Sequence, residues 1–323
     1  MKGKYLQSFD GTNIYYEFDF KGKTSKPVIT FIHGQSGGNH KMLQSQIDTI
    51  KKDYPTLALD LRGGGMSDLH NGDSKNFYSL ENFAKDVVNI WKHEKIEKGH
   101  TIGYSLGSTI AIKIFDITPE KINSLILLHP TYAPLKTTGR LNKFMVHSGL
   151  EWLLDNSISR TAACINKIRG IKERSYADYK KLKCRTMNFS DIFHYLNTRT
   201  PEEIISRLKL VEERNRWNVE EIIDSIDVPV LCISGNKDVW CLPYAAKEIA
   251  SRVNVEITLG SWTFPNLEIS KDRTYDQELR RLVYEGISNR NLQRSPEVES
   301  RIEYELEVIK DKGFSPYFLV VAD

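Results

Sequence analysis

The chain has 323 residues, of which 40% are hydrophobic and 27% charged, and its formal net charge is +3. This composition is ordinary for a folded globular protein, and so weak a charge gives no argument for nucleic acid or membrane binding. No apolar run approaches the roughly 20 residues of a membrane-spanning helix, and the N-terminus lacks the apolar core of a secretory signal. Four cysteines without C-x-x-C spacing fit buried or idle thiols in a reducing compartment, so we expect a cytoplasmic protein.

The first 130 residues alternate strand and helix patterns. Helices are predicted at Leu80–Trp91, after Ser79 as N-cap, and at Leu106–Ile117, which ends before Pro119. The predicted strands are Tyr5–Phe9, Ile14–Phe20, Val28–His33, Thr56–Leu61, His100–Tyr104 and Ser124–His129, the first two forming a hairpin. Strands that alternate with helices predict a doubly wound α/β fold with a mainly parallel sheet.

Residues 131–221 change to long helical patterns, and we interpret this segment as a helical cap. The helical patterns cover Leu141–Asp155 and Pro201–Arg216. Residues 167–185 contain eight basic side chains. The interpretation that we favour is a solvated helical face, and the alternative is a lid whose charge attracts anionic substrates.

A strand pattern returns at Val228–Ser234, and mostly helical patterns follow to the end of the chain. Thr274 is a candidate N-cap for a helix over Tyr275–Glu285, with Gly286 as its C-terminal stop. A second helix is predicted to begin at Ser295-Pro296 and to end at Gly313. Its apolar stripe would comprise Val298, Ile302, Leu306 and Ile309.

The sequence Gly103-Tyr104-Ser105-Leu106-Gly107 lies between a predicted strand and a predicted helix. A G-x-S-x-G turn in this context holds a serine nucleophile in a strained conformation, while the two glycines let neighbouring backbone approach. The helix that follows directs amides and a partial positive charge toward developing negative charge. The alternative is a glycine-rich turn with an incidental serine.

Three further segments favour the nucleophile. Phe31-Ile32-His33-Gly34-Gln35-Ser36-Gly37-Gly38 follows the third strand, Asp60-Leu61-Arg62-Gly63-Gly64-Gly65-Met66-Ser67-Asp68 follows the fourth, and Gly235-Asn236-Lys237-Asp238 follows the strand after the cap. With these four motifs in order, residues 1 to about 240 resemble the α/β-hydrolase family, in the branch that has a helical cap.

The resemblance implies roles for individual residues. Ser105 would be the nucleophile and Asp238 the triad acid, with the amides of Gln35 and Leu106 stabilising the oxyanion. The supporting residues would be His33, Gly34, Gly103, Gly107, Asp60 and Arg62, of which His33 shapes a loop and Asp60 and Arg62 are structural. The resemblance implies hydrolysis of a small-molecule ester, thioester or related acyl bond, with no metal and no organic cofactor.

The triad histidine is missing from the expected place. The family carries it after one further strand, but here Val253–Leu259 leads into Gly260-Ser261-Trp262-Thr263, and the last histidine of the chain is His194. Loss of this base typically costs about 10⁶ in turnover. His129, at the end of a strand, is a possible substitute base, although from the sequence we favour a satisfied polar residue at the entrance of the cap.

Residues from about 245 to 323 resemble a fragment of the bacterial DNA polymerase III α subunit, mainly through Arg301–Ile309 and Gly313–Asp323. The resemblance stops before the catalytic aspartates of the palm. Either the fusion is genuine, or, as we favour, a truncated hydrolase has been joined to a polymerase fragment in a chimeric reading frame. The expected domains are a core of residues 1–130 and 222–245, a cap of residues 131–221 and a fragment of residues 246–323.

Three functional hypotheses follow, in order of preference. The first is an acyl hydrolase that is weak or inactive because its base is missing. The second is a non-catalytic protein that binds a ligand beneath the cap. The third is a role of the C-terminal segment in DNA replication, which requires salt-dependent DNA binding. The oligomeric state, the acyl chain and the leaving group are left open.

Overall fold

The computed structural model describes residues 3–20, 26–34, 38–69, 76–137, 150–172, 199–238, 241–253, 272–290 and 292–311, together with Phe314, Ser315 and Leu319. The chain divides into two compact units, Met1–Glu256 and Ile257–Asp323. Within the described residues, no helix combines the length and the apolar character that crossing a membrane requires.

In the described part of the first unit, seven strands form one sheet in the order β1-β2-β4-β3-β5-β6-β7. The strands are β1 (Lys4–Gln7), β2 (Asn13–Asp19), β3 (Val28–Ile32), β4 (Thr56–Leu59), β5 (Gly99–Tyr104), β6 (Ile122–Leu128) and β7 (Val230–Ile233). β2 pairs antiparallel with β1 and β4, and the remaining neighbours are parallel. The predicted fold class, with its N-terminal hairpin and mainly parallel sheet, is therefore confirmed.

The helical segments of the first unit are η1 (His40–Leu43), α1 (Gln44–Ile50), α2 (Leu80–His93), α3 (Leu106–Ile117), η2 (Pro119–Lys121), α5 (Leu150–Ile168), α7 (Pro201–Arg214), α8 (Glu220–Ile223) and α9 (Pro243–Arg252). The Ser79 side chain accepts a hydrogen bond from the Asn82 amide, as its predicted N-cap role requires. Thr200 and Glu203 form a capping box at α7.

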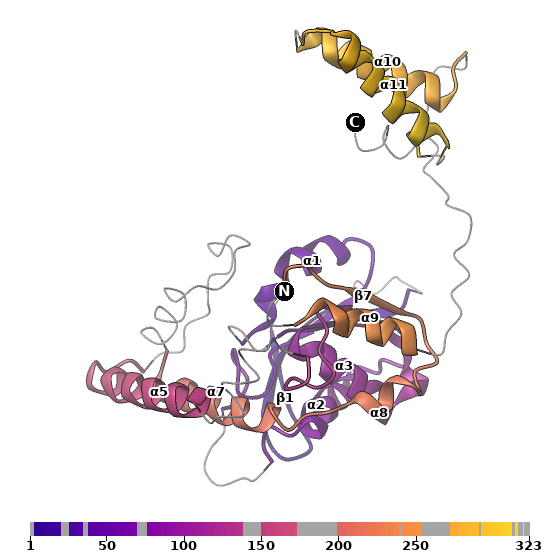
Figure 1. The fold of residues 1–323 in the computed structure, drawn as a ribbon. Helices are drawn as coiled ribbons and strands as arrows, with labels where there is room; N and C mark the ends of the chain where they lie inside the picture. Colours follow the sequence, from indigo (N-terminus) through magenta and orange to yellow (C-terminus); the bar gives the residue numbers. More distant parts are fainter. Residues whose placement is uncertain are drawn as a thin grey trace. The chain divides into compact units, whose positions relative to one another are not determined.

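Helices cover both faces of the sheet (Figure 1). On one face, Ile29 and Phe31 of β3 pack with Leu43 and Ile47, the latter from α1. On the other face, Ile32 joins the larger core, to which α2 and α3 contribute. Alternate side chains of one strand therefore enter two cores, which is why β3 is apolar at every position except Thr30.

α5 and α7 lie side by side in the segment that the sequence assigns to a cap, with Ala163 and Ile204 buried between them (Figure 1). α7 also contacts the core. The hydroxyl of Ser206 is hydrogen-bonded to that of Tyr78, and Glu213 accepts a hydrogen bond from the Tyr78 amide at 3.3 Å. Most of the predicted Leu141–Asp155 helix lies outside the described residues, and the remainder belongs to α5.

The second unit contains α10 (Tyr275–Asn289) and α11 (Pro296–Asp311), with Leu279, Leu306 and Leu319 in its core. Two sequence expectations are wrong here. Gly286 does not end α10, because the helix continues for one turn and buries Ile287. Val298, expected on the apolar stripe of α11, is 42% exposed. Gly313 and the predicted strand after Val253 lie outside the described residues.

Candidate active site

Ser105 occupies the sharp turn between β5 and α3. Its backbone has φ 51° and ψ −114°, a conformation that a residue with a side chain rarely adopts. A Cβ atom on Gly103 would lie 2.4 Å from the Gly107 carbonyl oxygen, and one on Gly107 would lie 2.2 Å from the Ile32 oxygen. Only glycine allows β3, β5 and α3 to meet this closely, so the two glycines fix the turn that presents the serine.

The oxyanion side of the site is partly described. Leu106 is the first residue of α3, so its amide lies at the positive end of a helix dipole beside Ser105. Gly34 lies against Ser105, because a Cβ atom there would be 3.2 Å from Ser105 Cβ. Gln35, expected to supply the second amide, lies outside the described residues.

Asp238 and His129 are in direct contact, although 109 positions separate them. Asp238 Oδ2 lies 2.6 Å from His129 Nδ1, and Asp238 Oδ1 accepts a hydrogen bond from the Cys241 amide at 3.0 Å. The contact arises because β6 and β7 are parallel neighbours and both residues follow the carboxyl ends of their strands. The acid expected after β7 is therefore paired with the histidine that follows β6.

The His129 side chain is held at the edge of the sheet and remains 37% exposed. Its backbone is also left-handed, with φ 47°. The His129 amide donates to the Ile233 carbonyl at 2.6 Å, and its ring packs edge-on against Tyr104, with 5.8 Å between centroids. These contacts place a partly accessible imidazole beside the residue that precedes the nucleophile.

Cys241 is a neighbour of Ser105 that the sequence did not indicate. Its Sγ lies 3.5 Å from Ser105 Oγ, and its side chain is buried. Burial raises the pKa of the Cys241 thiol, and the nearby Asp238 charge acts in the same direction, against the hydrogen bond from Ser105. The thiol is therefore neutral at pH 7. No sequence motif marks Cys241, so only the path of the chain after Asp238 reveals its approach to Ser105.

His33 has both ring nitrogens occupied. Nδ1 lies 2.6 Å from the Gly34 carbonyl oxygen, and Nε2 accepts the Leu61 amide at 3.0 Å. Because a carbonyl oxygen only accepts, the proton sits on Nδ1. Burial lowers the pKa of His33 to about 4. A neutral, enclosed ring of this kind connects the loops that follow β3 and β4 and has no nitrogen left for proton transfer.

Asp60 organises the loop after β4. Its side chain accepts hydrogen bonds from the His40 amide at 2.9 Å and the Met66 amide at 2.8 Å, and it lies 2.6 Å from His40 Nδ1. Burial would raise the pKa of Asp60, but the hydrogen bonds and charge of His40 outweigh burial and lower it. The fully buried Asp60 is therefore an ionised anchor for the glycine-rich loop.

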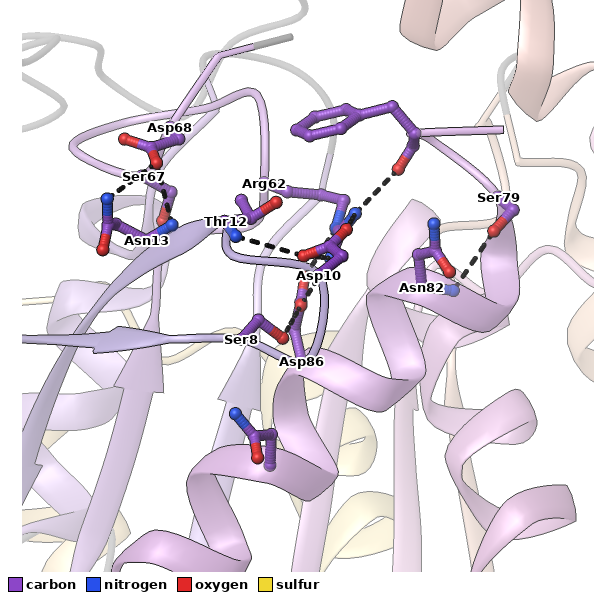
Figure 2. Close-up of polar contacts among 12 residues, drawn as sticks. Ser8, Asp10, Thr12, Asn13, Arg62, Ser67, Asp68, Ser79, Asn82 and Asp86 are labelled. Atoms are coloured by element: carbon purple, nitrogen blue, oxygen red, sulfur yellow. Dashed lines mark hydrogen bonds and ion pairs between the residues drawn. The ribbon is translucent and has the colours of Figure 1, made fainter. Parts of the chain in front are cut away.

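Arg62 anchors the same loop to α2 (Figure 2). Its guanidinium makes a bidentate contact with Asp86 at 2.7 and 2.6 Å, and it reaches Asp10 at 2.9 Å and the Phe77 carbonyl at 3.1 Å. Ser8 donates to Asp86 at 2.6 Å. Buried charges persist only when they are paired in this way, so the network holds the hairpin, the loop and α2 together.

No cluster of three or more histidine, cysteine, aspartate or glutamate side chains suited to a metal ion occurs within the described ranges. The arrangement contains a strained serine at a helix N-terminus and an acid–histidine pair at the same edge of the sheet. These are the groups that the sequence leads us to expect in a site for nucleophilic acyl transfer.

The chain belongs to the alpha/beta hydrolase fold family, whose model matches residues 27–255. It is 25% identical over 264 residues to a proline iminopeptidase of Lactobacillus helveticus, covering 76% of this chain and 85% of the relative. It is also 25% identical over 226 residues to 3-oxoadipate enol-lactonase 1 of Acinetobacter baylyi, covering 67% and 73%. These matches confirm the resemblance of the N-terminal part to the α/β-hydrolase family. The resemblance of the C-terminal part to the polymerase subunit is confirmed by a second family model, described below.

Solved structures show the same fold. An esterase from Exiguobacterium antarcticum superposes with a TM-score of 0.57 at 21% identity, covering 79% of this chain and 90% of that one. The enol-lactonase from Burkholderia xenovorans gives a TM-score of 0.57 at 19% identity, covering 78% and 88%.

Residues 277–323 match a second family model, described as the bacterial DNA polymerase III alpha NTPase domain. The chain is 37% identical over 84 residues to DNA polymerase III subunit alpha of Xylella fastidiosa. That match covers 24% of this chain but only 7% of the polymerase subunit.

Proposed function

We propose that the first unit is a serine hydrolase that cleaves a small-molecule ester, thioester or related acyl bond through a Ser105 acyl-enzyme. The observation that carries this proposal is the backbone of Ser105, which holds φ 51° at the N-terminus of α3. Strain of this kind is retained where it presents a reacting group. The relatives named as an iminopeptidase and a lactonase agree with chemistry at a carbonyl carbon.

Turnover is expected to be slow. In the described part of the chain, the hydroxyl of Ser105 is hydrogen-bonded to the neutral thiol of Cys241 and not to an imidazole. A serine without a base in hydrogen-bond contact is a poor nucleophile. The amides of Leu106 and Gln35 would supply the oxyanion site, and Asp238 would be the acid. α5 and α7 would form the cap that selects the acyl group.

The same contact between Ser105 and Cys241 favours the second candidate, a non-catalytic protein that binds an acyl compound beneath the cap. In that case ligand binding survives Ser105→Ala and no turnover is found.

Hydrolysis of p-nitrophenyl butyrate by the full chain tests the proposal, with Ser105→Ala as control. Covalent labelling by a fluorophosphonate provides a second readout. Serine-dependent turnover together with labelling supports the hydrolase. Rates equal to those of Ser105→Ala, with no labelling, overturn it in favour of the binding protein.

For the C-terminal segment we propose a chimeric reading frame, since residues 27–255 and 277–323 of one chain match two different family models. One long sequencing read of genomic DNA across codons 235–265 tests this. In a continuous natural gene, a single read contains both the hydrolase-like codons and the polymerase-like codons. The cytoplasmic compartment stays a proposal that follows from composition alone.

A further inference from the structure

We propose that His129, oriented by Asp238, is the general base and acid for Ser105, in place of a histidine from the C-terminal part of the sheet. This inference rests on the proposed hydrolase function and deepens it. It assigns the base to a residue after β6, which is the strand next to the one that carries the nucleophile.

The backbone places the two residues side by side. Tyr104 pairs with Leu128 in the parallel register of β5 and β6, so Ser105 and His129 are the next residues on adjacent strands. The Ser105 amide donates to the Leu128 carbonyl at 2.8 Å. Both residues leave their strands in a left-handed conformation, with φ 51° and 47°. Two neighbouring non-glycine residues in this costly conformation indicate a site built around both of them.

Asp238 orients the imidazole. Its carboxylate lies 2.6 Å from His129 Nδ1, and because an ionised carboxylate only accepts hydrogen bonds, Nδ1 carries the proton. The lone pair is then on Nε2. The ring packs edge-on against Tyr104 and approaches Gly235, where a Cβ atom would lie 3.5 Å from His129 Cε1. This is the histidine tautomer that a serine nucleophile needs.

The other polar neighbours do not offer a base. Cys241 contacts Ser105 Oγ, but burial keeps its thiol protonated. Asp238 has both oxygens engaged, one by His129 and one by the Cys241 amide. Among the described groups around the nucleophile, His129 therefore supplies the basic nitrogen. In this structure Nε2 makes no hydrogen bond to Ser105 Oγ within the described residues, so the proposal requires the two atoms to meet on substrate binding, directly or through one water.

The proton balance of the reaction is complete with this one imidazole. The Ser105 proton moves to His129 Nε2 as Oγ forms a bond to the acyl carbon, and the same proton passes to the leaving alcohol as its bond to that carbon breaks. Water then attacks the acyl-enzyme and gives a proton to Nε2. That proton returns to Ser105 Oγ when the acid product leaves. Asp238 remains ionised throughout and is a positioning residue.

The test compares His129→Asn with the unsubstituted full chain. Asparagine tolerates a positive φ and can still donate a hydrogen bond to Asp238, but it cannot take a proton. We expect its kcat/KM for p-nitrophenyl butyrate to fall about 10²- to 10⁴-fold, with an unchanged melting temperature. This is less than the loss of about 10⁶ in an intact triad, because Ser105 Oγ is hydrogen-bonded here to Cys241 and not to the imidazole. His100→Asn is the matched control, because His100 lies at the opposite end of β5 and contacts Ser124.

His129→Gly with added imidazole separates a catalytic from a structural role. A base role predicts that turnover rises with imidazole concentration in this variant and not in Ser105→Ala. Loss of activity without rescue, or full activity in His129→Asn while Ser105→Ala is inactive, overturns the inference and leaves the proposed hydrolase intact. Turnover that is equal in Ser105→Ala and the unsubstituted chain overturns both.

Discussion

The buried His33 makes the first unit sensitive to mild acid. In the unfolded chain a histidine has a pKa of about 6.5, whereas burial lowers the pKa of His33 to about 4 in the folded protein. The unfolded state therefore binds the proton first as the pH falls. The stabilisation that results is complete above pH 6.5 and is lost as the pH falls from 6.5 toward 4. Linkage gives a loss of about 2 kcal/mol between pH 7 and pH 5, and about 3 kcal/mol in total.

His33→Asn isolates this contribution. An asparagine amide can retain the hydrogen bond to the Gly34 carbonyl but does not titrate. It leaves the Leu61 amide without its acceptor, which costs about 1–3 kcal/mol at every pH. The gap in unfolding free energy between the two proteins should therefore narrow by about 2 kcal/mol between pH 7 and pH 5.

Urea unfolding at pH 7, 6 and 5, followed by tryptophan fluorescence, measures this gap. Trp91 and Trp217 are buried in the first unit and report on its unfolding. Taking the difference between the two proteins removes the contributions of other groups, among them His40. Burial would lower the pKa of His40, but Asp60 and Glu17 raise it, so acid acts on His40 in the opposite direction. A gap that stays constant across this pH range would refute the reasoning.

Three further outcomes are expected. Arg62→Met leaves the Asp86 carboxylate buried without its cation and should cost about 3–5 kcal/mol in urea unfolding, so a loss below about 1 kcal/mol would contradict the assigned network. Gly107→Ala places a methyl group 2.2 Å from the Ile32 carbonyl oxygen and should cost about 3 kcal/mol, and an unchanged melting temperature would contradict this packing. The hydrogen bond from His40 outweighs burial and lowers the pKa of Glu17 to about 2, so its stabilisation is present above pH 4.5 and is lost as the pH falls toward 2. Relative to Glu17→Gln, the unsubstituted chain should lose about 2 kcal/mol between pH 5 and pH 3, and parallel curves for the two proteins would exclude this contribution.

The sequence predicted the sheet well because burial on both faces leaves a clear signal. The run Val28–Ile32 is apolar except at Thr30, and the structure places its apolar side chains in two separate cores. Helix starts were also predictable, since a cap is a local interaction within four residues, as at Ser79. The predicted end of α10 at Gly286 was wrong. A glycine inside a helix costs only about 1 kcal/mol, and burial of Ile287 can offset that cost.

The site was only partly predictable for a different reason. Ser105 and Asp238 stand out because each follows a strand in a recognisable motif. The contact of Asp238 with His129 depends on β6 and β7 being neighbours, which no local pattern encodes. Cys241 carries no motif of its own, so its approach to Ser105 Oγ emerged only from the path of the chain after Asp238.

The left-handed backbones at Ser105 and His129 lower the stability of the folded chain while they hold the side chains of the proposed site. Each of them costs roughly 1–3 kcal/mol, and glycine at either position would relieve the strain while removing the proposed nucleophile or the proposed base. Selection for thermal stability alone would favour those glycines. A library sorted only by melting temperature would therefore accumulate inactive proteins, and any stabilisation of this chain has to be sought at other positions.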